Sequence, residues 1–336
     1  MKRKMFFCTT YYHVLISIIK MFFEKEKAEI AICMPGNDAV ALADKIQEKN
    51  IFEKVWTFKN VEEYTYHNIF ERLISGHRKN AAYIEKQIDT KAFLEHDIYI
   101  FHDDTWISHY LQDCGISYHL IEDALDSYQI IDQTVWFYMA NQPKWKIFLK
   151  KMLHFGYLYA GASPYTIDVE VNCIDGVKIP CTQKLIEQNR RKMFEQMTDE
   201  QRQIVREIFM DEQDKLLEKG KGRKVLLLTQ PLSADKVVMS NQEQIHLYQQ
   251  ILLPYERGNL ELYIKPHPRD EVDYTEVFKK AVILKKSMPV EVLDLIDDIY
   301  FDVGISFFST ALKGLMCVKQ KKYYEIDKVM KSDGTN

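Results

Sequence analysis

The segment Tyr263-Ile264-Lys265-Pro266-His267-Pro268-Arg269 has the most distinctive chemistry in the chain. It follows an apolar run, and its two prolines stiffen the backbone on either side of His267. Lys265 and Arg269 flank the histidine, so three cationic or potentially cationic groups meet at the end of one predicted strand. A lone histidine is more often structural, but this environment is typical of a site that binds phosphate.

A second polar segment, Ser306-Phe307-Phe308-Ser309-Thr310, lies between a predicted strand and a predicted helix. Ser309 or Thr310 can cap this helix, and the unpaired amides at a helix start bind anions. Ordinary helix capping explains the pattern equally well. Glu291, which follows Pro289, is a carboxylate of the kind that accepts both ribose hydroxyls of a nucleotide, although most glutamates are surface residues.

Three acidic residues stand where a general base could act. Asp235 follows the first strand of the second half, and Glu122 and Asp123 follow a strand of the first half. Asp103-Asp104 resembles the metal-binding Asp-x-Asp pattern only loosely. The sequence contains no clustered spacing of metal ligands and no glycine-rich phosphate loop, so no metal site is predicted.

These residues sit on a chain in which strands alternate with helices. Apolar runs that end in polar residues occur at 5–8, 29–33, 54–58, 97–101, 117–121, 224–229, 260–264 and 299–303, and a last strand is expected near 322–326. The alternation predicts parallel sheets covered on both faces. Polar residues at the carboxyl ends of such strands line the ligand crevice. In the first half this rule points to Thr9, Thr10, Asp103, Asp104, Glu122 and Asp123.

The predicted fold class is α/β, with two Rossmann-like, doubly wound domains that face a central cleft. We expect the first domain over residues 1–150, a helical connecting region over 151–222 and the second domain over 223–336. Within the connecting region, Thr198-Asp199-Glu200 indicates the start of a charged helix with Thr198 as its cap.

The bulk composition narrows the class of protein. A formal charge of -4 over 336 residues argues against a nucleic-acid binder. The six cysteines are scattered without a CxxC pair, which suits a reducing compartment. The stretch from Met5 to Phe23 is interrupted by polar residues, so it contains no uninterrupted apolar run near the roughly 20 residues that a membrane span needs. We therefore expect a cytoplasmic protein without a transmembrane segment.

These segments, in this order, resemble the bacterial sialyltransferases of glycosyltransferase family 52, the lipooligosaccharide sialyltransferase family. The motifs that carry the resemblance are Phe6 to Tyr11 (opening strand and loop), Ile121-Glu122-Asp123 (acidic motif), Gln230 to Asp235 (Pro-Asp loop), Pro266 to Arg269 (His-Pro motif) and Ser306 to Leu312 (Phe-Phe-Ser loop). The last two are the most specific. Ala124 replaces the usual glycine, the loop that holds Asp235 is about two residues longer than the family form, and residues 135–223 match poorly.

The resemblance implies a metal-independent GT-B enzyme without a cofactor. It would transfer sialic acid from CMP-sialic acid to a terminal galactose of a surface glycan, a lipooligosaccharide or a capsule, by inverting displacement. Asp235 would be the base and His267 would assist the departure of CMP, with Glu122 or Asp123 as the alternative base. The residues implied to bind CMP are Gln230, Lys265, Pro266, Glu291, Phe308, Ser309 and Thr310. Those implied on the acceptor side are Thr9, Thr10, Tyr11, Glu122 and Asp123.

Several alternatives stay open at this point. The donor could be another nucleotide sugar such as UDP-glucose, or a CMP-linked polyol phosphate as in teichoic-acid polymerases. A non-catalytic protein that binds nucleotide or glycan during polysaccharide assembly is a different class. Some family members form intertwined dimers, so a homodimer is a further expectation, as is peripheral contact with the inner face of the membrane.

Overall fold

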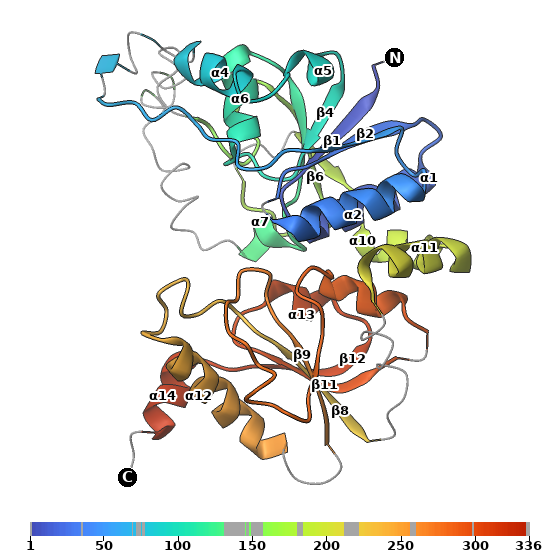
Figure 1. Cartoon of the computed structure of the whole chain (residues 1–336), viewed down its shortest axis with the longest axis vertical. Helices are drawn as coiled ribbons and strands as arrows, with labels where there is room; N and C mark the ends of the chain where they lie inside the picture. The colour runs from blue at the N-terminus through green and yellow to red at the C-terminus, as the bar shows by residue number, and fades with distance from the viewer. Residues whose placement is uncertain are drawn as a thin grey trace. The chain divides into compact units, whose positions relative to one another are not determined.

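The computed structural model describes residues 2–34, 36–68, 70, 71, 75, 78–130, 145, 148, 157–179, 184–211, 222–255, 260–297 and 299–333. The chain forms two compact units, Met1–Met197 and Thr198–Asn336 (Figure 1). Each unit is built around one parallel β-sheet. Within these described ranges, no helix combines the length and the apolar character that a membrane crossing requires.

The first unit contains a seven-stranded sheet in the order β3-β2-β1-β4-β5-β6-β7. Its strands are β1 Lys4–Cys8, β2 Ala28–Ile32, β3 Lys54–Thr57, β4 Asp97–Ile100, β5 Tyr118–Ile121, β6 Thr166–Val171 and β7 Leu185–Glu187. Its helices are α1 Tyr11–Phe23, α2 Asn37–Glu48, α4 Arg78–Glu85, α5 Lys91–Leu94, α6 Trp106–Cys114, α7 Ser127–Ile130 and α10 Arg190–Gln196. The strand order reverses between β1 and β4, and such a topological switch point is the usual site of ligand binding in parallel sheets.

Side chains of β1 alternate between the two faces of this sheet, as the two-residue period of a strand requires. Met5 and Phe7 join a buried cluster with residues of α4 and α6. On the opposite face, Phe6 contacts Phe52 and Tyr99, and the Cys8 thiol lies 3.3 Å from the hydroxyl of Ser17 on α1. Apolar residues on both faces explain why the central strands read as continuous apolar runs.

A buried charge cluster joins β6 to two helices of the first unit. The Glu170 carboxylate accepts hydrogen bonds from Lys20 of α1 and from Arg190 of α10. All three side chains are largely buried. Removing one member would leave a buried charge without its partner, so the cluster fixes the positions of α1 and α10 against the sheet.

The second unit contains a five-stranded sheet in the order β10-β9-β8-β11-β12. Its strands are β8 Arg223–Leu228, β9 Leu260–Lys265, β10 Val282–Ile283, β11 Phe301–Ser306 and β12 Val318–Tyr323. Its helices are α11 Asp199–Phe209, α12 Asn241–Leu252, η3 Leu253–Tyr255, η4 Val290–Leu295, α13 Thr310–Gly314 and α14 Ile326–Asp333. Helices α12 and α14 lie side by side and pack on one face of the sheet (Figure 1).

Gly304 of β11 allows close packing on the other face of the second sheet. A Cβ atom at this position would lie 2.5 Å from Leu312 Cδ1 of α13 and 2.8 Å from Val318 Cγ1 of β12. Neither distance is compatible with an ordinary carbon–carbon contact. The glycine therefore sets how closely α13, which follows the Phe-Phe-Ser segment, approaches the sheet.

The two Rossmann-like units confirm the predicted fold class, but the predicted domain boundaries need correction. β6 pairs with β5, and β7 pairs with β6, so strands of the expected connecting region belong to the first sheet. Helix α11, by contrast, belongs to the second unit, where Arg206 donates a hydrogen bond of 3.1 Å to the Leu295 carbonyl. The expected boundary at 150 lies outside the described residues.

Two local expectations for the second unit can also be compared with the structure. Thr198 is confirmed as a helix cap, since it and Gln201 form a reciprocal capping box. The last strand runs from Val318 to Tyr323 rather than near 322–326, because the chain turns into α14 at Ile326.

Candidate functional site

His267 lies in the loop that follows β9, and the backbone fixes its protonation pattern. Its Nδ1 accepts a hydrogen bond of 3.1 Å from the backbone N–H of Arg269. The neutral imidazole must therefore carry its proton on Nε2. Among the described residues, no group accepts a hydrogen bond from Nε2. His267 thus offers one N–H donor to a ligand.

The surroundings of His267 keep the ring uncharged near neutral pH. Partial burial lowers the pKa of His267 to about 4, and the positive charges of Arg269 and Lys265 contribute to the same shift. The negative charges of Asp235 and Asp270 oppose it only in part. An arriving phosphate would add negative charge beside the ring and raise this pKa again.

Asp235 lies in the exposed loop after β8, and the structure brings it to the His-Pro loop. The Arg269 guanidinium donates to both of its carboxylate oxygens, at 2.7 Å to Oδ1 and 3.2 Å to Oδ2. The turn is held by a 2.8 Å bond from the Asp235 N–H to the Pro231 carbonyl, and Lys236 adopts a left-handed φ of 57°. The sequence-predicted base and histidine therefore belong to one cluster, joined by an arginine.

Asp270 supports the loop that carries His267 through buried hydrogen bonds, and the sequence reasoning did not identify it. Its buried carboxylate accepts hydrogen bonds from Thr229 (2.5 Å), Tyr274 (2.8 Å) and Gln244 (2.9 Å). Thr229 in turn accepts from the backbone N–H of His267 at 3.2 Å. One carboxylate therefore ties the end of β8, helix α12 and the His-Pro loop together.

The predicted phosphate role of Lys265 is not supported by its position. The side chain is buried, and its ammonium group donates to the carbonyls of Pro266 (2.7 Å) and Lys286 (3.3 Å). Lys265 thus stabilises the backbone of the loop and acts on His267 through its charge. Glu291 lies in the first turn of η4, where burial raises the pKa of its carboxyl group to about 7.

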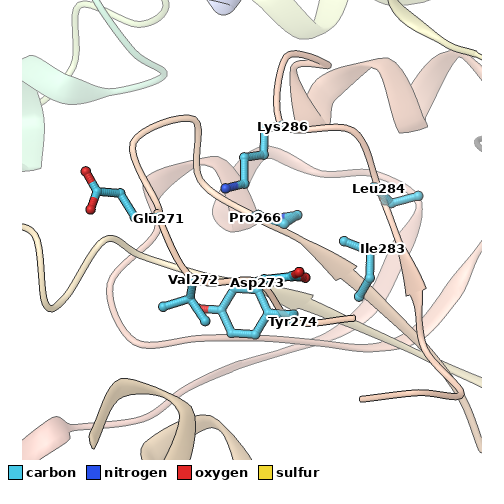
Figure 2. Close-up of a pocket in the computed structure, with 8 residues that line it drawn as sticks. All are labelled: Pro266, Glu271, Val272, Asp273, Tyr274, Ile283, Leu284 and Lys286. Carbon is cyan, nitrogen blue, oxygen red and sulfur yellow. The ribbon is translucent and has the colours of Figure 1, made fainter. Parts of the chain in front are cut away.

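A small pocket of about 140 Å³ lies beside the His-Pro loop (Figure 2). Pro266, Val272 and Tyr274 line it together with Ile283 and Leu284 of the neighbouring segment. The lining also includes the charged residues Glu271, Asp273 and Lys286. The sequence reasoning did not predict this pocket, because its walls come from segments on both sides of β10.

The Phe-Phe-Ser segment follows β11, whose neighbour in the sheet is β8. Phe307 packs into the core at 5.5 Å from the Tyr248 ring, whereas Phe308 is exposed. Ser309 is the cap residue of α13 but its side chain makes no capping bond, and Thr310 is the first helical residue. Since β9, β8 and β11 are adjacent and parallel, their following loops leave the same edge of the sheet.

Gln230 takes part in this edge through its backbone. Its N–H donates to the Tyr248 hydroxyl at 2.6 Å, and its side-chain amide donates to the Thr229 carbonyl at 3.0 Å. The hydrogen bonds of Thr229 and Arg269 thereby link Gln230, Asp235 and His267 within the second unit. Ser309 and Thr310 follow β11, which is adjacent to β8.

Three of the residues predicted for the acceptor side, Thr9, Thr10 and Asp123, are hydrogen-bonded to His13, which the sequence reasoning did not single out. His13 is fully buried and stacks on Phe101 with 4.3 Å between ring centroids. Its Nδ1 accepts from the Thr9 N–H at 3.2 Å, so its Nε2 donates to Asp123 Oδ1 at 2.7 Å. Thr10 caps α1 by accepting from the His13 N–H.

Asp123 remains anionic at neutral pH. Burial acts to raise the pKa of this carboxyl group, but its hydrogen bond and electrostatic interaction with His13 hold the pKa below its usual range. Tyr11 is the first residue of α1, and the pKa of its phenol is raised, mainly by partial burial.

Glu122 and Asp103 face the interior instead of the predicted crevice. Glu122 is buried and accepts hydrogen bonds from the backbone N–H groups of Asn172 (2.8 Å) and Tyr128 (3.3 Å). Asp103 is buried and accepts from the Gly161 N–H at 2.9 Å. Both carboxylates accept from backbone donors of neighbouring segments, and these hydrogen bonds hold the loops in place.

In the part of the chain that the structure describes, no three His, Cys, Asp or Glu side chains are grouped so that they could hold a metal ion. The expectation of a metal-independent reaction is a separate matter and stays a prediction.

Comparison with known proteins places the chain in a family. Residues 40–329 match the model of Glycosyltransferase family 52. An uncharacterized protein of Haemophilus influenzae is 40% identical over 90 residues, a match that covers 27% of this chain and 28% of that protein. The chain therefore shares only a limited segment with this relative.

The fold of this chain resembles those of two solved structures. One is a 2,6-sialyltransferase of Photobacterium sp. JT-ISH-224 in a ternary complex with the donor product CMP and the acceptor substrate lactose (TM-score 0.58, 12% identity, 95% of this chain and 71% of that chain). The other is the UDP-GlcNAc 2-epimerase of Neisseria meningitidis bound to UDP-GlcNAc (TM-score 0.53, 10% identity, 99% and 91%). At these identities the likeness concerns the fold alone. Since the family model spans most of both units, the chain belongs to glycosyltransferase family 52.

Proposed function

We propose that this protein is an inverting sialyltransferase that transfers sialic acid from CMP-sialic acid to a terminal galactose of a lipooligosaccharide or capsular glycan. The observation that carries the proposal is the neutral His267, whose Nε2–H donor has no acceptor among the described residues. A hydrogen bond from this group to the phosphate of CMP would stabilise the charge that develops as the glycosidic bond breaks. The fold likeness to a sialyltransferase that binds CMP and lactose supports the choice of donor and acceptor.

We assign the base to Asp235, because Asp235 and His267 belong to the same unit and their separation does not depend on how the units are arranged. Arg269 engages both oxygens of Asp235, so the carboxylate can accept a proton only after this ion pair opens. Asp123 is the alternative, since it is bonded to His13 through one oxygen. Either carboxylate would deprotonate the acceptor hydroxyl, a step for which base catalysis typically contributes about 10²–10⁴ in rate.

The remaining donor contacts are proposed for residues at the same edge of the second sheet. Ser309 and Thr310 would contribute hydroxyl and amide donors to the phosphate, Glu291 would accept from the ribose, and Phe308 would cover the nucleotide. The raised pKa of Glu291 means that this carboxyl group titrates near neutral pH, and a ribose would find it partly protonated. The acceptor would lie against Thr9, Thr10 and Tyr11.

The decisive experiment is incubation with CMP-sialic acid and a panel of galactosides, followed by mass spectrometry. We expect a sialylated product whose formation falls about 10²–10⁴-fold in His267→Ala. Asp235→Asn should lower the rate to a similar degree and Asp123→Asn should not, and the reverse result would move the base to the first unit. Folding of each variant is checked by circular dichroism.

Nucleotide specificity separates this proposal from a UDP-sugar transferase. CMP should raise the melting temperature, because a ligand that binds only the folded state stabilises it, and UDP should not. Stabilisation by UDP alone would refute the choice of donor. A full turnover rate in EDTA is also expected, and a loss restored by magnesium would contradict a metal-independent reaction.

We further propose that the protein works in the cytoplasm at the inner face of the membrane, and that it forms a homodimer like some members of the family that it resembles. Cell fractionation and light scattering test these two statements independently of the chemistry.

A further inference from the structure

We propose that Arg269 is a further donor-binding residue that exchanges partners during the reaction. In the resting protein it holds Asp235, and it moves to the phosphate when the donor binds, so that donor binding releases the base. This inference rests on the proposed function and adds an order to it, because the acceptor can be deprotonated only after the donor is in place.

The first support is the geometry of the pair. The two nitrogen–oxygen distances of 2.7 and 3.2 Å show a forked contact in which the guanidinium occupies both carboxylate oxygens. A carboxylate held in this way is a poor base. The Arg269 side chain is 65% exposed and that of Asp235 is 37% exposed, so solvent and ligand can reach the pair and open it.

The second support is the position of Arg269 relative to His267. The Arg269 N–H bonds the Nδ1 of His267 at 3.1 Å, which fixes the two residues in one short turn. The guanidinium also lies close enough for its charge to lower the pKa of His267. A phosphate that accepts from the Nε2 of His267 would therefore come within the field of Arg269.

The strengths of the competing contacts favour the exchange. An exposed ion pair typically changes an equilibrium by no more than about fivefold. A guanidinium binds phosphate through two charge-assisted hydrogen bonds and suits this geometry especially well. The phosphate would also gain the hydrogen bond from His267, which Asp235 does not have. Donor binding can thus outcompete the carboxylate.

The test is a double-mutant cycle on CMP binding, measured by isothermal titration calorimetry with Asp235→Asn, Arg269→Ala and the double variant. We expect Asp235→Asn to tighten CMP binding by about threefold to fivefold, because the competitor for Arg269 is gone. Arg269→Ala should weaken CMP binding about tenfold or more, and Asp235→Asn should then have no effect in the Arg269→Ala background. Arg269→Lys, which keeps the charge but loses the fork, should fall between the wild type and Arg269→Ala.

Matched controls come from the exposed pair of Arg191 and Glu195 in the first unit, which has a nitrogen–oxygen distance of 2.9 Å. Glu195→Gln and Arg191→Ala remove the same charges and should leave CMP binding unchanged. If wild type binds CMP but Asp235→Asn does not tighten binding, or tightens it equally without Arg269, the exchange is refuted and the proposed function stands. If wild type does not bind CMP, the proposed function fails first.

Discussion

Replacing Asp270 by asparagine tests whether the buried network below the His-Pro loop holds the second unit together. The carboxylate accepts hydrogen bonds from Thr229, Gln244, Tyr274 and the backbone N–H of Val272 at 2.5–3.1 Å. An amide offers one acceptor oxygen, so donors on the other side lose their acceptor. At roughly 1.5–3 kcal/mol for each hydrogen bond to a charged group, the loss of the two bonds on one side predicts a destabilisation of at least about 3 kcal/mol.

Urea denaturation measures the loss of stability in Asp270→Asn. The positions of the tryptophans help to assign this loss to one of the two units. All four tryptophans, at positions 56, 106, 136 and 145, precede residue 198 and so belong to the first unit, whose unfolding we follow by their fluorescence. Circular dichroism follows both units. We expect Asp270→Asn to lower the midpoint of the dichroism transition of the second unit by about 1.5 M urea and to leave the fluorescence transition unchanged.

The neighbouring Glu271 provides the control, because its side chain is exposed and is not part of the network. Glu271→Gln should leave both transitions unchanged. The reasoning is refuted if Asp270→Asn lies within about 1 kcal/mol of wild type, or if both variants lose the same stability.

Three further substitutions test other parts of the molecule. Gly304→Ala should cost about 1–3 kcal/mol in urea denaturation, since its Cβ would overlap Leu312 and Val318; an unchanged midpoint would show that the strand shifts freely. Glu170→Gln should cost about 3–5 kcal/mol, because it leaves a buried lysine and a buried arginine without their counter-charge, and a loss below about 1 kcal/mol would contradict this. Wild type should lose stability relative to His267→Gln as the pH falls from 6.5 to about 4, because the unfolded chain binds the proton at the ordinary pKa and the folded one resists it; parallel stability curves over this range would refute the depressed pKa.

The alternation of strands and helices could be predicted from the sequence because the strands are buried on both faces. Such strands appear as continuous apolar runs, as in the segment that contains Phe6, Phe7 and Cys8. The boundary between the units could not be predicted in the same way. β6 carries the polar residues Asp168 and Glu170, and it is identified as a strand of the first sheet only by its pairing with β5.

The candidate site was predictable where neighbours along the chain determine it. His267, Arg269 and Asp235 lie in turns marked by proline, and the structure brings them together. Lys265 was predicted to contact the phosphate, whereas in the structure its ammonium group donates to carbonyls of two loops. The position of such a buried lysine is determined by contacts between segments that lie far apart in the sequence.

His13 and Asp270 were missed for a related reason. Both are polar residues whose partners lie far away in sequence or on other elements, at Asp123 for the first and at Thr229 and Gln244 for the second. One signal was present for His13, since it falls among apolar residues on the buried face of α1. A histidine at such a position needs polar partners, and its spacing of four from Thr9 identifies one of them.

The hydrogen bond from the Arg269 backbone to His267 has a consequence for how this loop can evolve. The donor is a main-chain N–H, so the orientation of the imidazole does not depend on which side chain occupies position 269. Mutations there can therefore change electrostatics and substrate preference while the histidine stays correctly aligned. Proline is the one replacement that removes the N–H. The geometry of the proposed site is therefore preserved in most single substitutions at position 269.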